Sequence, residues 1–151
     1  WCPYAGEAHL IAGYVHPPTE AMMQEALALR GLQRYTTVKG LEGSCDLPRD
    51  RTAIIGAWRG TELERILLNA RDVGLGGTEV PYTTLEDWTE TVQQILNGRT
   101  ESSLYAAVLW NCGFYLWHLG FAETFAAGID KTKAVLGQHQ VLAHLQALQR
   151  N

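Results

Sequence analysis

The chain has 151 residues, of which 46% are hydrophobic, and this size and composition suit a globular domain with a sizeable core. Its formal net charge of −4 comes from scattered residues, so no basic stretch supports nucleic-acid binding. No apolar stretch reaches the roughly 18 residues of a membrane span, and we expect no membrane partner. Cys2, Cys45 and Cys112 lack the spacing of a disulfide framework or a zinc ribbon, which favours a reduced, cytoplasmic setting.

The first half of the sequence predicts a strand, a helix and a second strand. Residues 9–15 are apolar and β-prone, and the following Pro17-Pro18 pair can open a helix but cannot continue a strand. We expect a helix over residues 19–29, ended by Gly31. Residues 35–38, Tyr-Thr-Thr-Val, are β-branched and aromatic and predict the next strand. This order is typical of a parallel β-α-β unit.

The rest of the chain predicts further strands and then helices only. Residues 53–58 indicate a short strand, whereas residues 62–69 fit either a helix or a buried strand. Thr83 and Glu86 match a capping box, which predicts a helix over residues 85–96. Further helices are expected over residues 102–119, 122–136 and 139–149. No linker or repeat divides the sequence, so we expect one structural unit.

The loop of residues 39–46 concentrates the side chains with binding chemistry. It has the sequence Lys-Gly-Leu-Glu-Gly-Ser-Cys-Asp and follows directly on the predicted strand 35–38. Ligands of parallel sheets lie beyond the carboxyl ends of strands, where glycines admit a phosphate to the backbone amides and carboxylates hold magnesium. The loop is therefore a candidate phosphate or metal-phosphate site. An ordinary glycine-bearing turn with solvated charges fits the same spacing.

The other reactive and aromatic residues favour structural roles. Cys45 has no histidine near it in sequence and is expected to pack rather than to react. His139 and His144 are five residues apart and do not share a helical face, so we expect the histidines to be surface or capping residues. The aromatic residues within 104–119 lack the flanking positive charge of a base-stacking platform and favour core or subunit packing. Because no catalytic triad or Walker loop is present, we assign no catalytic residue.

Four segments of the chain carry a family resemblance. Residues 11–17, I-A-G-Y-V-H-P, look like a core strand and helix start, and residues 35–46 look like a strand followed by the loop H-G-x-D-G-x-D-E. Residues 70–75, A-R-D-V-G-L, are similar to P-E-D-L-G-L. Residues 97–98 with 106–111 are similar to L-x-G followed by D-A-V-L-L-N-A. In this order the segments resemble the anthranilate phosphoribosyltransferase family of nucleoside phosphorylase class II-type glycosyltransferases.

The resemblance implies that residues 1–151 are the C-terminal portion of a large glycosyltransferase-type α/β domain. Such a portion has mainly parallel strands with a crossover helix, followed by a helical C-terminal region, and it makes residues 62–69 a strand. Full-length members carry a helical dimerisation domain and phosphoribosyl-pyrophosphate loops upstream. We therefore expect activity, and a homodimer, only from the complete protein, with the N-terminal part as a partner. The start at Trp1 rather than Met also favours a part of a longer protein.

The resemblance also assigns roles to the loop. The family's acidic pair, which helps to hold magnesium and pyrophosphate, falls on Cys45 and Asp46 of this sequence. Asp46 is the implied metal ligand, and Cys45 is a poor ligand for a hard cation. Lys39 stands where the enzymes commonly have histidine, so the loop does not identify the acceptor. The substrate, phosphoribosyl pyrophosphate or a related phosphorylated sugar, is then expected at Lys39, Gly40, Glu42 and Gly43, with magnesium as cofactor of the complete protein.

Three functions fit the sequence. The preferred function is a phosphoribosyltransferase-like enzyme, of which this chain is a part. A paralogous branch of the family binds DNA without established transferase activity, and a Lys-Gly-x-Glu-Gly loop without the full acidic pair fits that branch too, although the acidic net charge opposes it. The third is a packing module whose aromatic helix, residues 104–119, buries against another part of the protein.

Overall fold

The computed structural model describes residues 8–150. These residues form two compact units, one that ends at Ala70 and one that begins at Arg71, and each is described by itself. Trp1 and Cys2 lie outside the described residues. The assignment of residues 1–151 to one glycosyltransferase-type domain stays a prediction. Within residues 8–150, no helix combines the length and apolar character needed to cross a bilayer.

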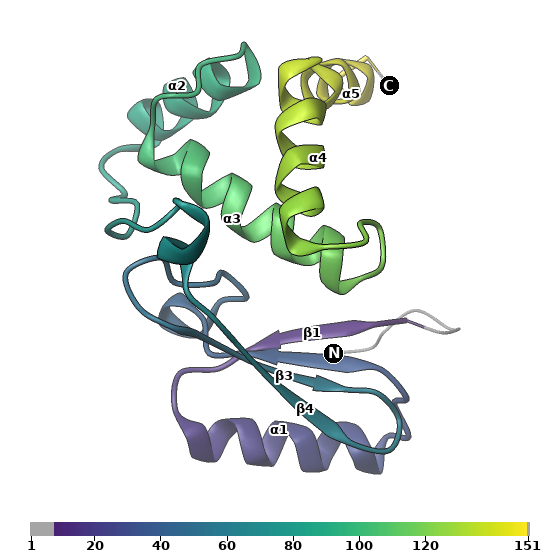
Figure 1. Ribbon diagram of the computed structural model, residues 1–151. Helices are drawn as coiled ribbons and strands as arrows, with labels where there is room; N and C mark the ends of the chain where they lie inside the picture. The colour runs from purple at the N-terminus through teal and green to yellow at the C-terminus, as the bar shows by residue number, and fades with distance from the viewer. Residues whose placement is uncertain (1–7, 151) are drawn as a thin grey trace. The chain divides into compact units, whose positions relative to one another are not determined.

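The first unit is a four-stranded sheet with one helix packed on a face (Figure 1). Its spatial order follows the chain, β1 (Leu10–Gly13), β2 (Tyr35–Val38), β3 (Ala53–Trp58) and β4 (Leu63–Leu68), with the crossover helix α1 (Pro17–Leu29) between β1 and β2. The mixed α/β class is therefore confirmed, and so is the strand within residues 62–69. The expected mainly parallel sheet is wrong, because β1 pairs with β2 in parallel, whereas β2 with β3 and β3 with β4 pair antiparallel.

The antiparallel pairs follow from the connections between the strands. Residues 59–62 join β3 to β4 in a tight turn, in which the Arg59 amide donates to the Glu62 carbonyl at 3.2 Å and Gly60 has a φ of 84°. The connection from β2 to β3 holds only one short 3-10 turn, Leu41–Gly43. A parallel return needs a crossover of about a dozen residues or more, usually a helix. The connection of residues 59–62 is too short for such a crossover, so the antiparallel pairing of β3 and β4 was readable from the sequence once both strands were placed.

Local sequence explains the limits of α1 and the packing of the sheet. Pro17 and Pro18 occupy the first helical turn, where a missing amide hydrogen costs nothing. The helix ends where Gly31 adopts a φ of 71°, a conformation that favours glycine. In the sheet, Tyr35 of β2 lies opposite Trp58 of β3, and their rings stack with centroids 5.9 Å apart.

The second unit is helical, as expected from the sequence. Its helices are α2 (Leu85–Leu96), α3 (Ser103–His118), α4 (Phe125–Gly137) and α5 (Gln140–Leu148). The capping residue of α2 is Thr84, whose side chain accepts from the Asp87 amide at 3.1 Å. The predicted box of Thr83 and Glu86 is thus one residue too early. The hydroxyl of Thr83 instead donates to the Asp87 carboxylate at 3.0 Å.

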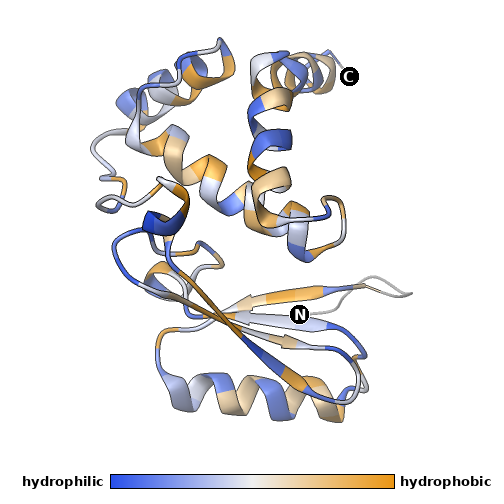
Figure 2. Ribbon diagram, in the orientation of Figure 1, coloured by the Kyte–Doolittle hydropathy of each residue, from blue (hydrophilic) through white to orange (hydrophobic). Residues whose placement is uncertain are grey.

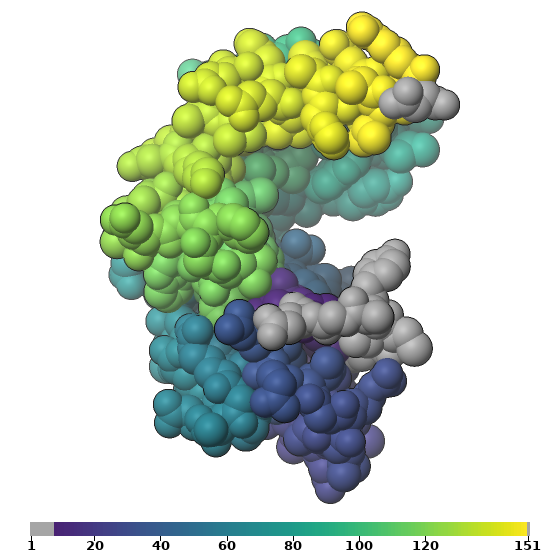
Figure 3. Space-filling view, turned by 90° about the vertical axis from the view of Figure 1, so that its right-hand side faces the viewer, coloured from purple at the N-terminus to yellow at the C-terminus, as the bar shows by residue number. Residues whose placement is uncertain are grey.

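The core of the second unit forms where α3 crosses α4. Gly113 and Gly128 let the two backbones approach, because a Cβ on Gly128 would overlap the Gly113 carbonyl oxygen. Trp110 and Phe114 are fully buried, which confirms the packing role of the aromatic residues in α3. Figure 2 shows α3 as largely hydrophobic and the middle of α4 as hydrophilic. In Figure 3, α4 and α5 form one continuous surface, coloured from yellow-green to yellow.

One expectation about the histidines is wrong. His118 is buried, and its ring stacks on Phe114 with centroids 5.1 Å apart, because the apolar residues of α3 surround the whole helix. His139 behaves as expected. It is exposed, and its Nδ1 atom lies 3.0 Å from the Leu96 carbonyl oxygen at the end of α2.

Candidate functional site

The loop of residues 39–46 lies at the carboxyl ends of the parallel strands β1 and β2. The amide of Tyr14, just after β1, donates to the Val38 carbonyl at 2.9 Å, which holds the two strand ends together. The amide of Lys39 donates to the Ile54 carbonyl of β3, also at 2.9 Å. The loop therefore leaves the sheet after Lys39, at the edge where ligands of open parallel sheets bind.

Backbone hydrogen bonds close the loop on itself. The Leu41 amide donates to the Asp46 carbonyl at 3.2 Å, and the Ser44 amide donates to the Leu41 carbonyl at 2.8 Å. Between them Glu42 has a φ of 50° and Gly43 a φ of 83°. Glycine adopts this conformation freely, whereas a non-glycine residue in it is strained, and such strain is often found at functional sites. The loop is a compact turn with a defined shape.

Two glycines allow the loop to pack on the strand ends. A Cβ added to Gly13, at the end of β1, would overlap the carbonyl oxygens of Gly43 and Ser44. A Cβ added to Gly40 would also overlap the Ser44 carbonyl oxygen. The obstacle at both positions is backbone rather than a mobile side chain. Gly40 therefore has a structural reason to be glycine, beyond the ligand-binding role expected from the sequence.

The charged residues of the candidate site lie around this turn. Glu42 and Asp46 are exposed, and Lys39 is half-buried at the base of the loop. The Ser44 hydroxyl donates to the Asp46 carboxylate at 3.1 Å and accepts from the Asp46 amide at 3.1 Å. The structure thus brings the five sequence-predicted residues into one turn. It also adds Ser44, which the sequence reasoning missed, as the residue that orients Asp46.

Cys45 points toward the sheet rather than toward solvent. The residue is half-buried, and its Sγ atom lies 3.7 Å from the Ile11 carbonyl oxygen of β1. Burial, together with the charge of Asp46, raises the pKa of the Cys45 thiol above its ordinary value. A neutral thiol is neither a good nucleophile nor a ligand for a hard cation.

The family resemblance implies magnesium as a cofactor. The residues present do not form a complete binding site for this ion. No group of three or more His, Cys, Asp or Glu side chains within residues 8–150 is arranged to hold a metal ion. In the position of the family's acidic pair, Asp46 offers a carboxylate and Cys45 does not. Magnesium usually combines one or two carboxylates with phosphate oxygens and water. This chain alone therefore supplies at most a minor part of such a site.

A buried polar network between α1 and the sheet was not foreseen from the sequence. Glu20 of α1 is 7% exposed, and its carboxylate accepts from the Thr37 hydroxyl of β2 and from the Arg65 guanidinium of β4, both at 2.7 Å. Tyr14 is hydrogen-bonded to the same carboxylate. Since Glu20 and Arg65 alone are 45 positions apart, no local motif signals the meeting of these residues. The network fixes α1 on the sheet close to the strand ends that carry the loop.

The network changes the pKa values of three of its members, and the hydrogen bond to Glu20 raises the pKa of Arg65 above its ordinary value. Burial raises the pKa of Glu20, but the hydrogen bonds from Arg65, Thr37 and Tyr14 outweigh burial and lower the net pKa. Burial, reinforced by Glu20, raises the pKa of Tyr14 to about 12. Glu20 is therefore the charged member at neutral pH, and Tyr14 stays neutral.

Comparison with known proteins matches most of this chain to part of longer proteins. No protein-family model matches the chain. An uncharacterised protein of Aquifex aeolicus is 27% identical over 129 residues, which is 82% of this chain and 40% of that protein. Anthranilate phosphoribosyltransferase of Verminephrobacter eiseniae is 23% identical over 143 residues, which is 93% of this chain and 42% of the enzyme. The chain thus spans about two fifths of the length of the curated relatives it matches.

A solved structure agrees with the sequence comparison. It is a variant of anthranilate phosphoribosyltransferase from Saccharomyces cerevisiae with Mg bound. The TM-score is 0.74 at 16% sequence identity, and the match covers 91% of this chain and 41% of the yeast chain. This likeness establishes the fold. In sequence and fold, the chain resembles about two fifths of an anthranilate phosphoribosyltransferase, consistent with the C-terminal part of such an enzyme.

Proposed function

We propose that this chain is part of a phosphoribosyltransferase-like glycosyltransferase and that residues 39–46 contribute to its binding site for a phosphorylated sugar. The observation that carries the proposal is the tight packing of a glycine-bearing turn against the carboxyl ends of β1 and β2. Ligands of such sheets bind there, and glycines let a phosphate approach the backbone. The likeness to anthranilate phosphoribosyltransferases supports phosphoribosyl pyrophosphate, or a related phosphorylated sugar, as the substrate class.

Each loop residue has a role within this proposal. The Lys39 ammonium contributes positive charge at the base of the turn, and Gly40 and Gly43 keep the backbone accessible to phosphate. Glu42 supplies a carboxylate beside the phosphorylated sugar. Asp46, oriented by Ser44, is the residue that we assign to the metal, although the incomplete ligand set carries no catalytic step. Phosphoryl oxygens and another part of the protein have to supply the remaining ligands.

The proposal places catalysis in a larger assembly. This chain matches about two fifths of its relatives' length. Within the proposal, the complete enzyme is a cytoplasmic homodimer that also has an N-terminal part. The chain alone binds the phosphorylated sugar weakly and transfers nothing. The weak binding is testable with this chain, whereas the homodimer and the transfer reaction require the complete protein.

Calorimetry with phosphoribosyl pyrophosphate and magnesium tests the site. We expect weak but saturable binding to the chain that Asp46→Ala reduces. Asp50→Ala is the matched control, because Asp50 is an exposed carboxylate of the same connection that pairs with Arg51 at 2.9 Å. Absence of saturable binding would refute the proposal, and equal binding by the wild type and the Asp46→Ala variant would refute the metal role of Asp46.

The second candidate function is a nucleic-acid binder on the same scaffold. The observation that favours this function concerns Cys45, which stands in place of one carboxylate of the family's acidic pair. Its side chain packs toward β1 and offers no ligand for a metal-bound phosphate. A DNA mobility-shift assay at several salt concentrations distinguishes the two functions. Real phosphate contacts must weaken steeply as salt rises. Binding to DNA with that salt dependence, without binding to phosphoribosyl pyrophosphate, would replace the enzyme proposal.

A further inference from the structure

Two segments of the first unit support the loop of residues 39–46, and together we call them the loop seat. One is the end of β1 with the residues that follow it. There Gly13 lies against the backbone of Gly43 and Ser44, and a Cβ on Gly43 would lie 3.2 Å from a methyl carbon of Val15. The other is the end of β2, from which the loop starts. The position of the loop therefore depends on how these two segments are held.

A buried side chain from each side of the loop seat is hydrogen-bonded to the same carboxylate. Tyr14, in the segment after β1, is buried, and its hydroxyl donates to Glu20 of α1. Thr37, in the last position but one of β2, is fully buried and donates to Glu20 Oε1 at 2.7 Å. Arg65 of β4 donates to the same oxygen, also at 2.7 Å, and balances its charge. One carboxylate thus joins both sides of the loop seat.

The sheet leaves room for this carboxylate. A Cβ on Gly56 of β3 would lie 2.6 Å from the hydroxyl oxygen of Thr37 and 2.9 Å from Glu20 Oε1. A residue other than glycine at position 56 would therefore displace both partners. With Gly56, the elements α1, β2, β3 and β4 all meet at the Glu20 carboxylate.

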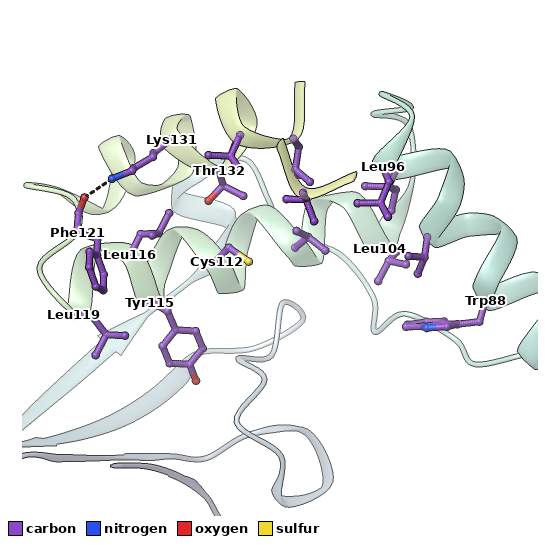
Figure 4. A pocket seen from close by; sticks show the side chains of 16 residues that line it. Trp88, Leu96, Leu104, Cys112, Tyr115, Leu116, Leu119, Phe121, Lys131 and Thr132 are labelled. Atoms are coloured by element: carbon purple, nitrogen blue, oxygen red, sulfur yellow. Dashed lines mark hydrogen bonds between the residues drawn. The ribbon is translucent and has the colours of Figure 1, made fainter. Parts of the chain in front are cut away.

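Packing alone does not explain why this contact is ionic. In the second unit, helices pack through apolar side chains such as Leu109 of α3 and Leu136 of α4. Apolar side chains, among them Leu104 and Leu116, also line the groove along α3 (Figure 4). A well-packed apolar contact is often as stabilising as a buried ion pair, whereas hydrogen bonds to a carboxylate fix distance and direction. The ionic contact between α1 and the sheet therefore indicates a need for defined positions rather than for stability.

We propose that Glu20 is a positioning residue of the candidate site, whose carboxylate holds the ends of β1 and β2 at the spacing that seats the loop of residues 39–46. The ligand of that loop rests on the proposed function, whereas the bonds from Tyr14, Thr37 and Arg65 do not. Binding groups keep their geometry only when neighbouring hydrogen bonds support them. Glu20 is buried between α1 and the sheet, so it acts through the loop and does not touch the ligand.

Replacement of Glu20 by glutamine tests the positioning role. Glu20→Gln keeps the size of the side chain but removes its charge, so the bonds from Thr37 and Arg65 weaken. Hydrogen exchange should then be roughly tenfold faster at the Leu41 and Ser44 amides, whose hydrogen bonds close the loop. Exchange at the wild-type rate at both amides would overturn the proposal.

Leu27→Ala is the matched control for lost stability. Leu27 is a buried residue of the same helix, and its truncation destabilises the first unit without removing a polar partner of Glu20. The two variants are compared at urea concentrations at which the amides of β3 exchange at the same rate. Under that condition Glu20→Gln should show the faster exchange of the loop. Equal loop exchange in the two variants would show that Glu20 contributes only stability, and the proposal would fail.

Tyr14→Phe provides a milder second variant if Glu20→Gln does not fold. It keeps the aromatic ring and removes only the hydroxyl that donates to Glu20. Exchange at the Ser44 amide should become roughly three- to tenfold faster, as expected for the loss of one hydrogen bond. An unchanged rate at this amide would contradict the role of the carboxylate in holding the end of β1.

Calorimetry with phosphoribosyl pyrophosphate and magnesium separates this inference from the proposed function. Where the wild-type chain binds, Glu20→Gln should weaken binding roughly tenfold, because displaced donors lose a hydrogen bond to the ligand. Leu27→Ala, measured where it is fully folded, should bind as the wild type does. Unchanged affinity in Glu20→Gln would overturn the inference. If the wild-type chain does not bind, the proposed function fails, whereas faster loop exchange in Glu20→Gln still supports the positioning role.

Discussion

Replacement of Gly40 by alanine should destabilise the loop of residues 39–46 far more than an ordinary glycine-to-alanine change. The φ of Gly40 is −86°, which alanine tolerates, so only contacts decide the outcome. The new Cβ would overlap the Ser44 carbonyl oxygen and lie 2.8 Å from the Ser44 carbonyl carbon and 3.0 Å from the Asp46 carbonyl oxygen. All three are backbone atoms, and no side-chain rotation relieves the overlap.

The magnitude follows from what has to move. Overpacking against fixed atoms costs about 1–3 kcal/mol. Displacing Ser44 also strains the Ser44–Leu41 and Leu41–Asp46 backbone hydrogen bonds, each with a net contribution of about 1 kcal/mol. The expected loss is therefore about 2–4 kcal/mol, confined to the first unit. Because the chain divides into two compact units, a single global unfolding transition is not assumed.

Hydrogen exchange resolved by residue is the suitable assay. Gly40→Ala should speed exchange at the Ser44 and Leu41 amides and in β2, and leave α3 and α4 unchanged. Gly137→Ala is the control, because a Cβ there meets open space within α4 and should stabilise the helix by about 0.4–1 kcal/mol. If Gly40→Ala left exchange in the loop at the wild-type rate, the close approach described above would be wrong.

The polar network under the sheet gives further tests. Thr37→Val removes the buried donor to the charged Glu20 and should lower the free energy of urea unfolding by about 1.5–3 kcal/mol. Thr36→Val removes the partner of His9 at 2.7 Å and should cost only about 0.5–1.5 kcal/mol. The reverse order would contradict the assigned charge of Glu20. Because folding raises the pKa of Tyr14 from 10.0 to about 12, the unfolded state loses this proton first, so stability should fall as pH rises from about 10 to 12. Tyr14→Phe should make that fall shallower, and an unchanged slope by circular dichroism would count against the raised pKa.

The sequence predicted elements better than it predicted their pairing. Residues 35–38, 53–58 and 85–96 were located with the observed limits, because β-branched runs and periodic apolar positions are local signals. Strand direction was predicted wrongly because the family resemblance implied mainly parallel strands, although neither residues 39–52 nor residues 59–62 carry the helix that a parallel return usually needs. The α2 cap was displaced by one residue because adjacent Thr83 and Thr84 can both begin a helix, and only the structure shows which hydroxyl meets the Asp87 amide.

The candidate site shows the same division between local and distant signals. The loop of residues 39–46 was recognisable because its glycines, acids and lysine are contiguous. The sequence did not reveal why residue 40 is glycine. A Cβ at this position would overlap the Ser44 carbonyl oxygen, which lies next to Gly40 only in the folded turn. No role was assigned to Glu20 from the sequence, because its partner Arg65 lies 45 residues further along the chain, in β4.

The loop separates into a part that sets its shape and a part that could perform chemistry. Gly13 and Gly40 hold the turn against the strand ends through backbone contacts, and neither contact involves the side chain of Cys45 or Asp46. The acidic pair could therefore lose a carboxylate at Cys45 without moving the turn, so a family-like fold does not by itself establish transfer chemistry. Gly40→Ala and Asp46→Ala probe the two parts independently. If Gly40→Ala abolished binding of phosphoribosyl pyrophosphate while Asp46→Ala left it intact, the backbone would carry the affinity, and the metal role of Asp46 would have to be abandoned.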